Sequence, residues 1–175
     1  DFTPDGRYAL VMNDRGVLRA FATQTGELHG EPAYFDKEKK HASFNEHRFL
    51  RDGRMLVASI STPLAIWSVD PPMPPEVFAE DAGHVTAIDV DEDQDLIVTA
   101  QYASGEEPMK VHYWSLSKRS LEREILLRGD KAQYGAAAII AGDRVVITTS
   151  EGGMILLDRE GEVLSAHQVC DDYLH

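Results

Sequence analysis

The sequence has little of what several classes of protein require. Only one cysteine, Cys170, occurs in 175 residues, so the chain can form no internal disulfide. Its most apolar stretch, YGAAAIIAG at 134–142, is far shorter than the ~20 residues that cross a bilayer as a helix. We therefore expect no membrane insertion. A fold that needs no oxidation favours a reducing compartment, which predicts a cytoplasmic protein.

Basic residues are also scarce. The sequence has 17 Lys and Arg against 30 Asp and Glu, and its formal net charge is −13. A field of this sign repels DNA and RNA, so we expect no direct binding of nucleic acid. Residues 76–107 contain ten acids and no Lys or Arg. Three interpretations of this segment stay open: a solvated acidic edge, a surface for a basic partner, or a cation site.

Motifs of catalysis and cofactor binding are missing. The sequence contains no G-x-S-x-G, no G-x-x-x-x-G-K-[ST] and no G-x-G-x-x-G. Residues 89–100 begin like a calcium loop, but Gln94 stands where that loop needs Gly, and Ala100 where it needs Glu. We predict no catalytic residue, no metal ligand and no cofactor. Metal-ligand side chains do gather at the C-terminus, without a second cluster at ligand spacing: His167, Cys170, Asp171, Asp172 and His175.

A repeat is visible in the turns. Four segments begin with a turn containing Asp or Gly and continue as apolar and β-branched residues. They are 5–12 (DGRYALVM), 52–59 (DGRMLVAS), 93–100 (DQDLIVTA) and 142–149 (GDRVVITT). Each is followed by a second apolar strand and then by a shorter, more polar one. The second strands are 16–23, 63–69, 110–116 and 153–158.

Unequal copies whose starts lie 47, 41 and 49 residues apart predict an all-β fold. The favoured architecture is a β-propeller with about four blades of four antiparallel strands. The second apolar strand would be buried on both faces, and the most polar strand would form the outer edge. For 117–129 a helical turn stays open beside the favoured loop and strand. The predicted blades cover 1–40, 41–82, 83–131 and 132–175.

The third repeat carries the residues that relate the chain to a known family. His84, preceded by Gly, opens this repeat, and Thr99 and Trp114 follow in its strands. Trp67 holds the place of Trp114 one repeat earlier. Together with the phrase F-x-P-D-G-R at 2–7, this pattern resembles a WD-repeat β-propeller.

The resemblance implies a hydrogen-bonded set of side chains inside a blade. In the family a His, a Ser or Thr, an Asp and the Trp form this set. The turn at 102–109 offers only Glu106 and Glu107 where the family has the Asp. The Gly-His pair is missing from the other repeats, so the repeats are degenerate and other kinds of propeller stay open. Structural roles are implied for four residues: His84, Thr99, Trp67 and Trp114.

Four blades are fewer than most propellers need to close. We expect a seven- or eight-bladed ring, completed by more of the polypeptide or by another copy. The first residues are typical of the end of a first strand, followed by a turn at Asp5-Gly6. We expect the rest of that strand, or a partner that replaces it, outside the 175 residues. The true N-terminus and any targeting signal stay open, because residue 1 is not Met.

The resemblance implies a non-enzymatic protein-interaction, sensing or scaffold module of a larger protein or complex. Its partner would be a protein of basic character or the remaining blades. The alternative is a propeller hydrolase or lyase with a site at the central channel, for which Asp1, Asp89 and Arg48 are candidates. A purely structural oligomerisation role is a third hypothesis. The predicted interaction face comprises Asn13, Asp14, Arg15, Ser61, Thr62, His84, Tyr102, Glu106, Glu107, Ser150 and Glu151.

Overall fold

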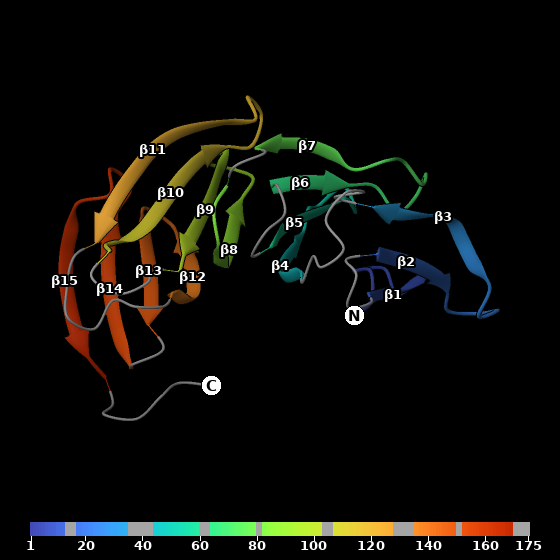
Figure 1. Cartoon of the computed structure of the whole chain (residues 1–175), viewed down its shortest axis with the longest axis horizontal. Coiled ribbons are helices and arrows are strands. Elements are labelled where there is room, and N and C mark those ends of the chain that lie inside the picture. Colours follow the sequence, from blue (N-terminus) through green and yellow to red (C-terminus); the bar gives the residue numbers. More distant parts are fainter. Residues whose placement is uncertain are drawn as a thin grey trace. The chain divides into compact units, whose positions relative to one another are not determined.

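The protein is all-β throughout the part of the chain that the structure describes. A computed structural model describes residues 1–12, 17–34, 44–59, 64–79, 82–102, 107–127, 135–149 and 152–169. Within these ranges fifteen strands form four antiparallel sheets, and no residue is helical (Figure 1). The all-β prediction is confirmed. None of these described sheets closes into a barrel or a ring.

The chain divides into two compact units, Asp1–Gly83 and His84–His175. The first unit contains a three-stranded sheet and a four-stranded sheet, each with its strands in chain order. The three-stranded sheet consists of β1 (Tyr8–Met12), β2 (Val17–Ala22) and β3 (Leu28–Tyr34). The four-stranded sheet consists of β4 (Phe44–Phe49), β5 (Met55–Ser59), β6 (Leu64–Trp67) and β7 (Glu76–Ala79).

The second unit contains two four-stranded sheets, again with consecutive strands as neighbours. The first consists of β8 (Val85–Asp91), β9 (Leu96–Gln101), β10 (Met109–Ser115) and β11 (Ser120–Leu127). The second consists of β12 (Gly135–Ala141), β13 (Arg144–Thr149), β14 (Gly153–Asp158) and β15 (Val163–Gln168). Residues 117–119 form a turn and 120–127 form β11, so the described part of the segment 117–129 contains no helical turn.

The first sheet corrects the prediction of four strands in every repeat, because the structure describes only three. In place of a further strand, Phe2 forms a single antiparallel bridge with Ala9. Beside it, Leu10 N donates to Asp1 O at 2.7 Å, and Asp1 N donates to Leu10 O at 3.1 Å. A turn at Gly6, with φ of 69°, joins this short pairing to β1.

The two D-G-R turns of the first unit use the same hydrogen bonds. Asp5 Oδ1 accepts from Arg7 N, and Asp52 Oδ1 accepts from Arg54 N, both at 3.0 Å. In each turn the Nε of the Arg donates a second hydrogen bond to the Oδ2 atom of the same Asp. Asp side chains stabilise turns by accepting from the backbone two residues on, so the repeat in sequence is also a repeat in turn chemistry.

Each unit has its own apolar core between the faces of its two sheets. In the first unit, Leu10 and Leu18 of the three-stranded sheet pack with Val57 and Trp67 of the other sheet. In the second unit a larger cluster includes Val98, Val111, Tyr113, Ala138, Ile147 and Leu157. Burying a side chain such as Leu or Val stabilises the fold by about 1.5–3 kcal/mol.

Burial separates inner strands from outer strands. Among the second strands, which were predicted to be buried, β6 is buried at every residue and β10 at every residue but Lys110. β14 departs from the prediction, because most of its residues are only half-buried. β9 is also buried at every residue. β11 and β15 are the last strands of their sheets and are exposed at most residues. An exposed polar edge opposes unwanted pairing with other chains. The prediction that the most polar strand lies at the edge is therefore confirmed for these two sheets.

Candidate functional site

The predicted interaction face lies mostly outside the described residues. This applies to Asn13, Asp14, Arg15, Ser61, Thr62, Glu106, Ser150 and Glu151. The structure brings His84 and Tyr102 together: Tyr102 N donates to His84 O at 2.8 Å, and their ring centroids are 5.0 Å apart. Burial lowers the pKa of His84. Glu107 is exposed at the start of the segment that leads into β10.

Two of the four residues with predicted structural roles, Thr99 and Trp114, are hydrogen-bonded to each other. Trp114 Nε1 donates to Thr99 Oγ1 at 3.0 Å, and both side chains are buried. Trp67 is buried in the core of the first unit, whereas His84 contacts Tyr102. A different histidine, His112, lies against Trp114, with ring centroids 5.4 Å apart and an edge-to-face geometry.

His112 is the centre of a polar row that the sequence analysis missed. Gln101 Nε2 donates to His112 Nδ1 at 3.2 Å, and His112 Nε2 donates to Glu124 Oε2 at 2.8 Å. The row crosses β9, β10 and β11, and the hydrogen bond from His112 lowers the pKa of Glu124. Thr99 and Gln101 are two residues apart, as are His112 and Trp114, and residues at this spacing in a strand share a face. This spacing is the signal that could have predicted the row from the sequence.

Asp1, Arg48 and Asp89 are the candidates for an enzyme site. Asp1 and Arg48 belong to the first unit, and Asp89 belongs to the second. Asp89 Oδ2 accepts from Ile140 N at 2.8 Å and thereby links β8 to β12. Asp1 Oδ2 lies 2.7 Å from His47 Nε2, and Arg48 Nη1 donates to His47 O at 2.9 Å. Burial lowers the pKa of His47. Among the described residues, no three His, Cys, Asp or Glu side chains are placed to hold a metal ion.

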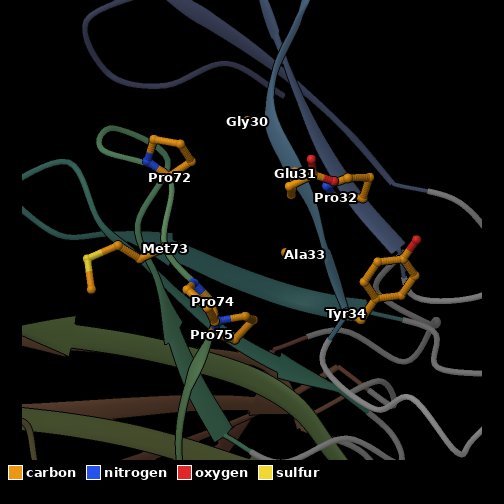
Figure 2. Close-up of a pocket in the computed structure, with 9 residues that line it drawn as sticks. All are labelled: Gly30, Glu31, Pro32, Ala33, Tyr34, Pro72, Met73, Pro74 and Pro75. Atoms are coloured by element: carbon orange, nitrogen blue, oxygen red, sulfur yellow. The ribbon is translucent and has the colours of Figure 1, made fainter.

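The first unit contains a groove between a strand and a loop, which we call the β3 groove. One wall is residues 30–34 of β3, and the other is residues 72–75 of the loop before β7. Figure 2 shows Glu31, Pro32 and Tyr34 along one side and Met73, Pro74 and Pro75 along the other. The cavity has a volume of about 430 Å³, within the range of ligand pockets, roughly 300–1,000 Å³.

The loop wall is held in place by Asp70. Its Oδ2 atom accepts from Arg7 Nη1 at 3.0 Å and from Tyr8 OH at 3.2 Å. Ser68 makes two hydrogen bonds within the loop. Its Oγ donates to Pro71 O at 2.7 Å, and its carbonyl oxygen accepts from Met73 N at 3.2 Å. These bonds connect the loop to Arg7 and Tyr8 and close it on itself, so they restrict the movement of the wall.

A glycine lets the strand and the loop approach closely. Gly30 has φ of 69°, a conformation that side chains disfavour. A Cβ at this position would lie 2.5 Å from Pro72 Cβ and 2.8 Å from Pro72 Cγ. The narrow end of the β3 groove therefore depends on glycine at position 30.

The walls of the β3 groove are mainly apolar. Tyr34 and Met73 are 48% and 57% exposed, large fractions for such side chains. Glu31 is the charged residue among the lining residues. The sequence DPPMPP at 70–75 has the composition of a turn, and nothing in it points to β3. The arrangement can shelter apolar side chains next to one carboxylate.

Two comparisons bear on the identity of the chain. No family model matches it, and no curated protein matches it significantly. Among the described residues, we find no helix with the length and apolar character needed to span a membrane.

Proposed function

We propose that the chain is a non-enzymatic protein-interaction module of a larger protein or complex. Its sheets would be blades of a degenerate WD-repeat-like β-propeller, completed to seven or eight blades. The recurring antiparallel sheets with consecutive strands support this architecture, as do the repeated D-G-R turns.

The observation that carries the function is the β3 groove. It presents exposed Tyr34 and Met73 on walls whose movement is restricted by hydrogen bonds to Asp70. Preordered surfaces bind more tightly because less conformational freedom is lost on association. Tyrosine is also among the residues that dominate binding energy at protein interfaces.

The test is a quantitative capture of proteins on the immobilised chain, followed by hydrogen exchange of the chain in each purified complex. We expect discrete partners, enriched at least tenfold over beads that carry an unrelated acidic protein. We also expect amide protection on the surface of the chain. Without any enriched partner, or with enriched proteins that protect no amide, the interaction function would be wrong.

A further inference from the structure

We propose that the β3 groove docks an extended segment of a partner protein that carries apolar side chains next to a Lys or Arg. This inference deepens the proposed interaction function and rests on it. The recognising chemistry consists of rigid apolar walls, an exposed strand edge and one carboxylate, and each of these features restricts the partner.

The rigid walls select apolar side chains. Pro32, Pro72, Pro74 and Pro75 line the groove together with Ala33. Proline and alanine lose almost no side-chain entropy when a ligand covers them. An apolar side chain that displaces water from these walls is therefore bound at little ordering cost to the protein.

The shape of the groove selects an extended segment. Its walls are five consecutive residues of β3 and four consecutive residues of the loop, so the groove follows the strand. β3 is the last strand of its sheet, and none of the strands that the structure describes pairs with its outer edge. A peptide in extended conformation directs alternate side chains to one side, which matches a groove that follows a strand. Pro32 offers no N–H, so side-chain contacts carry more of the binding here than in full strand addition.

The charge of the groove selects a basic residue. Glu31 lines it and is exposed, and none of the lining residues is Lys or Arg. The formal net charge of −13 acts in the same direction over a longer range. Complementary charge raises the association rate and disfavours acidic competitors.

The experiment uses a phage-displayed library of random linear peptides selected on the full chain. Synthetic copies of the enriched peptides are then titrated against the wild type and its variants. We expect enriched sequences with two or more apolar residues and a Lys or Arg. Tyr34→Ala and Met73→Ala should each weaken binding at least tenfold, and Glu31→Lys should abolish the preference for basic peptides.

Two matched controls separate the groove from the rest of β3. Leu28→Ala removes an apolar side chain of the same strand that is 49% exposed but does not line the groove. Glu27→Lys reverses a charge just outside the strand. Both should bind the peptides like the wild type. The far-ultraviolet circular dichroism and urea midpoint of every variant show whether its fold is intact.

The outcomes distinguish this inference from the proposed function. If the enriched peptides bind Tyr34→Ala, Met73→Ala and the wild type equally, the groove is not their site, although the interaction function stands. Enrichment of acidic or purely polar peptides would also overturn the groove proposal. If no peptide is enriched while captured proteins protect amides elsewhere, the groove proposal fails alone. If neither capture nor selection yields a binder, both proposals fail.

Discussion

Gly30 sets the distance between β3 and the loop that carries Pro72. Any other residue there would have to accept φ of 69° and a Cβ 2.5 Å from the proline ring. The left-handed conformation alone costs a non-glycine residue about 1–2 kcal/mol. The proline ring is rigid and cannot turn aside, so a substitution must push the loop away from the strand.

We therefore expect Gly30→Ala to lower the free energy of unfolding by more than the conformational strain alone. Gly26→Ala is the matched control, because Gly26 has φ of 73° and no atom within 4 Å of an added Cβ. The difference between the two variants should be about 1–3 kcal/mol, as for other overpacked sites. Urea unfolding measures both values. Equal losses would show that the loop yields freely and that the groove wall is not rigid.

The element scale shows what the sequence could and could not predict. The turns and the strand alternation depend on nearby residues, so the positions of β1, β5, β9 and β13 could be predicted from D-G-R and related turns. The exposed outer edges could also be predicted from their polarity. The row from Gln101 through His112 to Glu124 depends on the register of three strands, which a single sequence does not reveal.

The candidate site was missed for a similar reason. Gly30 and Pro72 are far apart in the sequence. Each is accounted for by its local structure, Gly30 by a bend in the strand and Pro72 by a turn. The two residues approach each other because the two sheets pack together and because hydrogen bonds from Arg7 and Tyr8 to Asp70 hold the loop in place. Neither sequence motifs nor turn-forming residues predict that Gly30 and Pro72 lie close together.

Strands β10 and β11 should give the protein a measurable acid response through Glu124. The hydrogen bond from His112 lowers the pKa of Glu124, and Lys110 Nζ at 3.6 Å adds to the effect. A carboxyl with a lowered pKa in the fold stabilises it above the unfolded value, about 4.3, and that stabilisation is lost as the pH falls through the folded value. Glu124 is 40% exposed, so solvent screening keeps the contribution small.

We expect Glu124→Gln to reduce the loss of stability on acidification below about pH 4.3. The measurement is the urea midpoint of wild type and variant at neutral pH and in acid. An identical acid response in wild type and Glu124→Gln would show that the hydrogen bond with His112 does not contribute to stability.

At the scale of the whole molecule, the two units should respond separately to damage. Each has its own apolar cluster, and Leu157 is fully buried in the cluster of the second unit. Leu157→Ala should destabilise that unit by about 2–5 kcal/mol, the cost of a core cavity. Stability in proteins is often organised in cooperative segments, so the opening should spread through β8–β15 and spare β1–β7.

Hydrogen exchange followed strand by strand measures this response. In Leu157→Ala, amides of β9, β10, β13 and β14 should exchange faster, while those of β2, β5 and β6 keep their wild-type rates. Val57→Ala, in the core of the first unit, should give the reciprocal pattern. If either substitution accelerates exchange equally in both units, the chain opens as a single cooperative block. The two cores would then unfold in one cooperative transition, because a substitution in either core would raise the exchange rates of strands in both units.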